Sequence, residues 1–77
     1  MKASLELTNQ LNWELNLDNF FNTSINEEYI QLLGWYSLEM EVLLFSKGYQ
    51  VEYNELYKNY RYESPRVKII LTEKEND

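Results

Sequence analysis

The chain has 77 residues and a formal net charge of −6, it contains no cysteine and no histidine, and 16% of its residues are aromatic. This length suffices for one domain, and the aromatic content is too high for a chain that is disordered throughout. The composition also excludes a disulfide-stapled secreted scaffold, and no apolar run approaches the roughly 20 residues of a membrane-spanning helix.

We therefore expect a cytoplasmic protein with one domain over residues 1–72 and a flexible acidic tail over residues 73–77. Asn, Tyr, Ile, Lys and Glu are abundant while Gly, Pro, His and Cys are scarce. This usage is typical of AT-rich coding sequences, as in many low-GC bacteria and their phages. If a phage encodes the chain, the expected compartment is the host cytoplasm.

Apolar residues at odd-numbered positions dominate the first 17 residues. Polar residues separate Leu5, Leu7, Leu11, Trp13, Leu15 and Leu17. A period of two is typical of a strand with one buried face, and Thr8-Asn9-Gln10 can turn the chain. We predict a β-hairpin with strands at residues 3–8 and 11–17. The alternative is one helix that buries Leu7, Leu11 and Leu15, which Trp13 and Leu17 fit poorly.

Residues 24–47 predict one long central helix of about 22 residues, about 33 Å at 1.5 Å per residue. Ser24 and Glu27 form a capping-box pattern at its start, and Gly48 can take a positive φ just after its end. Two apolar stripes run along the helix on nearly opposite sides. The first consists of Ile25, Tyr29, Leu32, Leu33, Tyr36, Met40, Leu43 and Leu44. The second, which is the candidate apolar interface, consists of Trp35, Leu38, Val42 and Phe45.

A helix that is apolar on two sides needs two covers. The N-terminal hairpin can cover one side. Either the C-terminal strands cover the second stripe and make it internal core, or that stripe is the surface of a homodimer or of a complex with another protein. Gly34 lies beside the second stripe, where its missing Cβ permits a close approach.

The C-terminal third predicts strands. Tyr49, Val51 and Tyr53 alternate as in a strand at residues 49–53, and a helical turn follows at 54–58. Residues 60–62 and 67–71 predict a hairpin around Glu63-Ser64-Pro65-Arg66. The expected fold is α+β in a ββαβ(β)β-like order: an N-terminal β-hairpin, one long central α-helix and C-terminal strands, with small single-layer sheets packed on the helix.

The residues that usually carry chemistry are missing or badly spaced. With no histidine or cysteine, the commonest general base, thiol nucleophile and zinc ligands are absent. Two glycines cannot make a phosphate-binding loop, and the acidic pairs Glu27/Glu28 and Glu39/Glu41 do not share a helix face. We therefore expect no enzyme, no cofactor, and no catalytic, cofactor-binding or metal-binding residues.

The charge balance favours an acidic protein-interaction module. The candidate acidic surface, which suits a basic partner, consists of Glu6, Glu14, Asp18, Glu27 and Glu28. One specific version is a phage- or mobile-element-type inhibitor that binds a basic surface of a nucleic-acid-handling protein. We also expect a homodimer.

The alternative function is a small nucleic-acid-binding regulator that uses the segment 57–68. Its candidate basic/aromatic surface consists of Tyr57, Lys58, Tyr60, Arg61, Tyr62, Arg66 and Lys68. Single-stranded nucleic acids bind such residues by stacking and charge. The simpler interpretation is tyrosines on a sheet face with cations beside them, and the acidic balance of the whole chain favours that interpretation.

Overall fold

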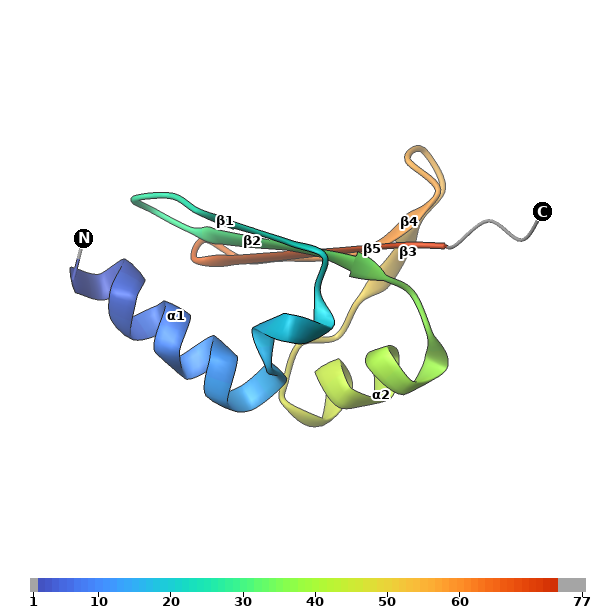
Figure 1. Ribbon diagram of the computed structural model, residues 1–77. Helices are drawn as coiled ribbons and strands as arrows, with labels where there is room; N and C mark the ends of the chain where they lie inside the picture. The colour runs from blue at the N-terminus through green and yellow to red at the C-terminus, as the bar shows by residue number, and fades with distance from the viewer. Residues whose placement is uncertain (1, 74–77) are drawn as a thin grey trace.

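A five-stranded sheet with two helices on one of its faces makes up the protein, so the fold is α+β (Figure 1). The computed structural model describes residues 2–73; most of the predicted acidic tail, residues 74–77, lies outside them. The helical elements are α1 (Lys2–Leu15), the 3-10 helix η1 (Leu17–Asn19) and α2 (Leu38–Ser46). The strands are β1 (Asn22–Ile25), β2 (Ile30–Trp35), β3 (Glu52–Asn54), β4 (Asn59–Glu63) and β5 (Val67–Thr72).

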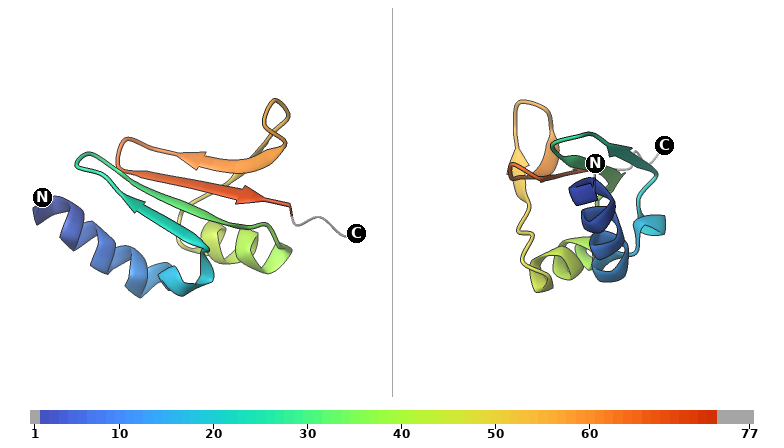
Figure 2. Two further views of the ribbon diagram at one scale, coloured as in Figure 1. Left: turned by 45° about the horizontal axis from the view of Figure 1, so that its top comes forward. Right: turned by 90° about the vertical axis from the view of Figure 1, so that its left-hand side faces the viewer.

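The strand order β1-β2-β5-β4-β3 places the two most apolar strands, β2 and β5, beside each other inside the sheet. These two strands pair in parallel, with Leu32 opposite Ile69, and all other neighbours are antiparallel. Alternate residues of β2 and β5 are buried on the sheet face that packs against the helices. The residues between them point to the opposite, uncovered face. Figure 2 shows both helices beneath the sheet in two further views. The fold therefore has two layers, and within residues 2–73 no helix or strand covers the other face of the sheet.

The predicted N-terminal hairpin is wrong, because residues 2–15 form the helix α1. The alternative prediction, a single helix with its leucines buried, agrees with the structure. Leu11 and Leu15 are 0% and 1% exposed, whereas Trp13 is 89% exposed. Leucines four apart satisfy both a two-residue and a helical period, so the pattern alone did not separate them. Asn16, at φ 58°, ends the helix, and the side-chain oxygen of Asn12 accepts a hydrogen bond from the Leu17 amide at 3.0 Å.

The predicted long central helix is also wrong over its first half. Residues 22–35 form the hairpin of β1 and β2, and only residues 38–46 are helical. Ser24 lies in β1 and caps no helix; the cap of α2 is Ser37, whose hydroxyl accepts a hydrogen bond from the Met40 amide at 3.0 Å. At the other end the prediction is confirmed, because Gly48 has φ 92° and its amide donates to the Phe45 carbonyl at 3.0 Å.

The C-terminal third is largely as predicted. β4 and β5 form the expected hairpin, in which the Ser64 amide donates to the Val67 carbonyl at 2.9 Å. The strand predicted at residues 49–53 is shorter and lies later in the chain, as β3 at Glu52–Asn54. Residues 55–58 form a turn that joins it to β4, in place of the helical turn predicted at 54–58. The predicted order ββαβ(β)β is thus corrected to αββαβββ, and the separate small sheets become one sheet.

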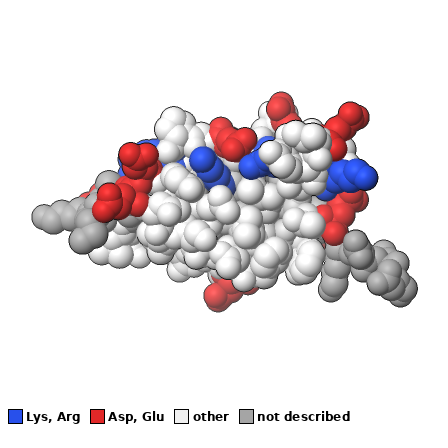
Figure 3. Space-filling model, turned by 90° about the horizontal axis from the view of Figure 1, so that it is seen from above, with Lys and Arg blue, Asp and Glu red and all other residues white. Residues whose placement is uncertain are grey.

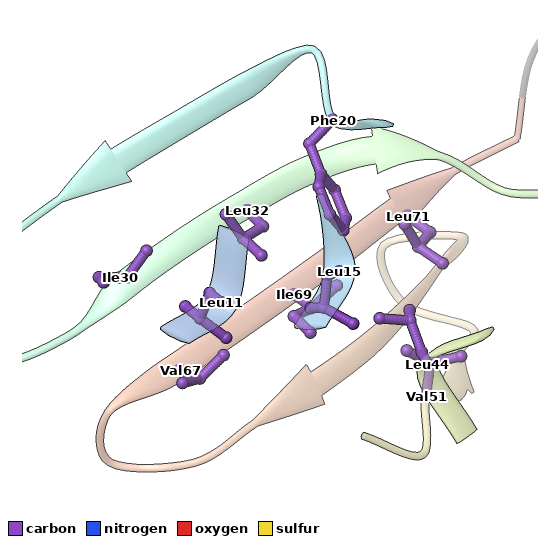
Figure 4. Packing of buried hydrophobic residues seen from close by; sticks show 10 residues of the cluster. All are labelled: Leu11, Leu15, Phe20, Ile30, Leu32, Leu44, Val51, Val67, Ile69 and Leu71. Atoms are coloured by element: carbon purple, nitrogen blue, oxygen red, sulfur yellow. The ribbon is translucent and has the colours of Figure 1, made fainter. Parts of the chain in front are cut away.

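The core lies between the helices and the sheet (Figure 4). Leu11 and Leu15 enter it from α1, Leu44 enters it from α2, and Phe20 enters it from the segment before β1. The sheet and its approach contribute Ile30, Leu32, Val51, Val67, Ile69 and Leu71. Gly34 faces this layer too: a Cβ built on it would lie 2.9 Å from Cδ1 of Phe20. A close approach at Gly34 is therefore confirmed, but it lies in the core beneath β2 and not beside the second apolar stripe of a helix, as predicted.

Candidate functional site

Three large apolar side chains lie on the solvent side of α2. Leu38, Val42 and Phe45 are 70%, 59% and 64% exposed, and their spacing of four and three residues puts them on one side of the helix. We call these three residues the outer face of α2. On the opposite side Leu44 is fully buried, and Met40 and Leu43 pack against the core. The helix is thus apolar on both sides, as predicted for its longer version, but no C-terminal strand covers its outer face.

The fourth residue of the predicted interface lies elsewhere. Trp35 ends β2 and belongs to the uncovered face of the sheet, where its ring centroid is 4.9 Å from that of Phe21. The structure therefore divides the predicted stripe into the outer face of α2 and an aromatic pair on the sheet. The prediction had assigned one helical period to residues 24–47 and so grouped Trp35 with the residues of α2. In the structure the chain changes from strand to helix at residues 36–37, which separates them.

A groove of about 300 Å³ runs beside the outer face of α2. Its walls are Leu38, Glu41, Val42, Phe45, Gln50 and the buried Val51. An apolar wall with a few polar groups at its rim is typical of a surface that binds another molecule.

The carboxylate of Glu41 is held in place at the rim of this groove. It accepts a hydrogen bond from the Tyr36 hydroxyl, and the Tyr36 ring stacks on Tyr60 with centroids 3.9 Å apart. The hydrogen bond to Glu41, together with desolvation, raises the pKa of Tyr36 to about 12. Glu39 lies about 100° further round the helix from Leu38, so one acid flanks each side of the apolar face. Both acids also lie in the first turn of α2, where the helix dipole favours negative charge.

The structure disperses the predicted acidic surface over three elements. Glu6 and Glu14 lie on α1, and Asp18 lies in η1. Glu27 and Glu28 occupy the turn between β1 and β2, at the same end of the molecule as the start of α1 (Figure 1). The carboxylate of Glu14 accepts a hydrogen bond from the Tyr49 hydroxyl at 3.0 Å. Desolvation, with that hydrogen bond, raises the pKa of Tyr49 to about 12.

The predicted basic/aromatic surface is divided between two faces. Tyr60 and Tyr62 point towards the helices and pack against the core, with Tyr62 edge-on to Tyr49 at 5.2 Å. Arg61 and Lys68 point to the uncovered face. The other three residues lie in turns: Tyr57 and Lys58 between β3 and β4, and Arg66 between β4 and β5.

The uncovered face of the sheet is a second candidate surface, of which the sequence had predicted only separate residues such as Arg61 and Lys68. Besides the Phe21/Trp35 pair, the Lys68 ammonium lies 4.3 Å from the ring centroid of Tyr29, and the Arg61 guanidinium 5.0 Å from that of Tyr57. Figure 3 shows bases along one side of this face with acids around them, and a broad uncharged area beside them. The sequence signal for this face was the alternation of residues in β2 and β5. Which residues share the face follows only from the register of the two strands.

Comparison with known proteins gave no match to any protein-family model, curated protein or solved structure. Within residues 2–73, no three acidic side chains gather closely enough to hold a metal ion. No helix in that part of the chain combines the length and the apolar character needed to cross a membrane.

Proposed function

We propose that the protein is a non-enzymatic protein-binding module whose docking surface is the outer face of α2 and the adjoining groove. One observation carries the proposal. Leu38, Val42 and Phe45 are together exposed on a helix whose opposite side already anchors it in the core.

The fold itself does not need apolar residues at these three positions. Leu44 supplies the fully buried contact of α2, and the Ser37 cap and Gly48 supply its ends. Polar residues would serve equally well at positions 38, 42 and 45, and they would reduce the risk of aggregation that contiguous apolar surface carries. A binding partner gives these residues a role that folding does not.

The net charge of −6 supports a basic partner. An acidic protein associates faster with a basic surface because the two potentials are complementary. The specific version is an inhibitor that binds a basic surface of a nucleic-acid-handling protein, with carboxylates in place of phosphates.

Site-specific photo-crosslinking tests the proposal. A benzophenone amino acid at Val42 or Phe45, in cells that make the protein, is expected to give a covalent adduct with another protein. The control is the same label at Leu56, an apolar residue in the turn between β3 and β4 that is 80% exposed. If positions 42 and 45 give no adduct, or give the same adducts as position 56, the proposal is refuted.

A second candidate function, single-stranded nucleic-acid binding, concerns the uncovered face of the sheet. The Nε of Arg61 and the Oδ1 of Asn59 are buried without a hydrogen-bond partner in the described part of the chain, and the Phe21/Trp35 pair offers a stacking surface. This function ranks second because the strand residues of that face have no net positive charge: two acids, Glu52 and Glu63, balance the two bases Arg61 and Lys68. Gel shifts over a salt series test it, since phosphate binding weakens steeply with salt; no shift at low salt would remove it.

A further inference from the structure

The shape of the outer face of α2 indicates what kind of element it binds. The steps from residue 38 to 42 and from 42 to 45 are the four- and three-residue steps of a helix–helix seam. The backbone of α2 is hydrogen-bonded within the helix, so a partner strand cannot pair with it as it would with a sheet edge. An amphipathic helix in a groove uses side chains alone, and this groove runs between α2 and residues 50–51.

The length of α2 fits a short helical partner. Nine residues give about 13.5 Å of axis at 1.5 Å per residue. Leu38 and Phe45 mark the two ends of the seam, and Val51 forms the wall beside it. A facing helix of two to three turns would contact all four side chains.

The charges beside the seam favour a partner helix with particular charges beside its own apolar stripe. Glu39 lies on one side and Glu41 on the other, and α2 itself contains no lysine or arginine. A partner helix with lysine or arginine beside its apolar stripe would place a cation opposite each acid. One with acidic flanks would meet like charge on both sides.

A second copy of the chain fits these flanks poorly. If two α2 helices packed antiparallel about Val42, the two Glu41 carboxylates would face each other, and neither helix offers a base along its length. Like charges at such facing positions are destabilising.

We infer that the outer face of α2 binds an amphipathic helix of another protein, with basic residues on both sides of that helix's apolar stripe. The inference rests on the proposed function and adds the chemistry of the partner to it.

Two synthetic helical peptides test the inference. They share the same leucine seam on an alanine-rich background and carry either lysine or glutamate at the flanking positions. In titrations of the ¹⁵N-labelled protein at low salt, we expect the lysine peptide to shift the amide resonances of α2 and of residues 50–51. It should bind at least about tenfold more tightly than the glutamate peptide, because two pairs change from repulsion to attraction.

Matched variants assign the binding to the outer face of α2 and to its charges. Val42→Glu should abolish the shifts, whereas Leu56→Glu, at the apolar turn between β3 and β4, should leave them unchanged. Glu39→Gln and Glu41→Gln should each weaken binding of the lysine peptide about two- to fivefold. Glu41→Gln keeps an oxygen that can accept the Tyr36 hydrogen bond, so its effect reports charge.

Equal affinity for both peptides overturns the inference, as do shifts confined to the sheet face, no binding of either peptide, or a dimer in sedimentation that Val42→Glu dissociates. In each case crosslinking at Val42 still decides the proposed function separately. A crosslinked partner whose attached segment is neither helical nor basic retains the function and removes this inference.

Discussion

Gly34 offers the sharpest test of the packing beneath the sheet. It is a buried residue of β2, and a Cβ placed on it would lie 2.9 Å from Cδ1 of Phe20 and 3.3 Å from Cδ2 of Leu71. The substitution Gly34→Ala adds this one carbon and leaves the strand's hydrogen bonds in place.

The size of the effect follows from these distances. Carbon atoms pack best about 3.5–4.0 Å apart, so the Phe20 ring must move by roughly 0.6–1 Å. Phe20 is only 7% exposed and points into the core beside Leu15 and Leu71 (Figure 4). Overpacking of this kind costs about 1–3 kcal/mol, and the better strand propensity of alanine offsets about 0.5–1 kcal/mol of it. The midpoints of these two ranges give a net loss of about 1 kcal/mol in the free energy of unfolding, or a fall of roughly 4–8 °C in Tm.

Urea and thermal unfolding, followed by circular dichroism, measure this loss. Gly48→Ala is a contrasting variant whose cost reports positive-φ strain alone, because Gly48 has φ 92° and a Cβ added to it would meet no atom within 4 Å. Phe20→Leu removes ring atoms, so Gly34→Ala should cost at least about 1 kcal/mol less in that background than in the wild type. Strict additivity of the two changes, or a Gly34→Ala protein as stable as the wild type, would refute the packing argument.

Three other predictions concern the helix α2 and the tyrosines. Val42→Glu should change the free energy of unfolding by less than about 0.5 kcal/mol, whereas Leu44→Ala on the same helix should cost about 2–5 kcal/mol in denaturant titrations; a large loss from Val42→Glu would show that the outer face is core. Ser37→Ala removes the hydroxyl that caps α2 and should cost about 0.5–2 kcal/mol, while Ser46→Ala at the other end should cost less. Tyr36 and Tyr49 have pKa values raised from 10.0 to about 12, so the folded state holds their protons more tightly than the unfolded state. Their stabilising contribution is complete below a pH of about 10 and is lost as the pH rises to about 12, and ultraviolet titration should show two late-ionising tyrosines that Tyr36→Phe and Tyr49→Phe remove one at a time.

The sequence predicted best where composition and turn residues supported the period. Residues 67–71 are a short run rich in β-branched residues, and the turn at Ser64-Pro65 precedes it, so the β4–β5 hairpin was predictable. Gly48 indicated the end of α2 for a similar reason, since few residues other than glycine adopt φ 92°.

The sequence failed where two periods coincide. Leu7, Leu11 and Leu15 fit both a strand and a helix, and only their burial on one side of α1 decides between them. Ser24 and Glu27 resembled a helix start, yet Glu27 and Glu28 occupy a hairpin turn. The capping box is a local signal, and the pairing of β2 with β5, which is distant in the sequence, outweighs it.

Half of the candidate site was nevertheless visible in the sequence. Leu38, Val42 and Phe45 were grouped correctly because they lie within the part of the predicted helix that is helical. Trp35 was assigned wrongly because it lies before the change to helix. The uncovered sheet face was found only in part. Arg61 and Lys68 were named in the predicted basic/aromatic surface, but the face as a whole depends on a strand order that the sequence does not specify.

In the proposed complex, the apolar contacts of the outer face of α2 would supply only part of the binding free energy. Full burial of a large apolar side chain contributes about 1.5–3 kcal/mol, so covering the exposed parts of Leu38, Val42 and Phe45 contributes roughly 3–6 kcal/mol in total. Association costs about 4–15 kcal/mol in lost freedom, and micromolar binding needs a net free energy of about −8.2 kcal/mol. The partner's own apolar stripe would contribute a similar amount, and the cost of association offsets most of that sum, so a seam of three side chains would bind weakly. In the proposed complex the contact would therefore extend along the groove to Gln50 and Val51. Because many apolar stripes could satisfy the seam, we propose that Glu39 and Glu41 determine which helices bind.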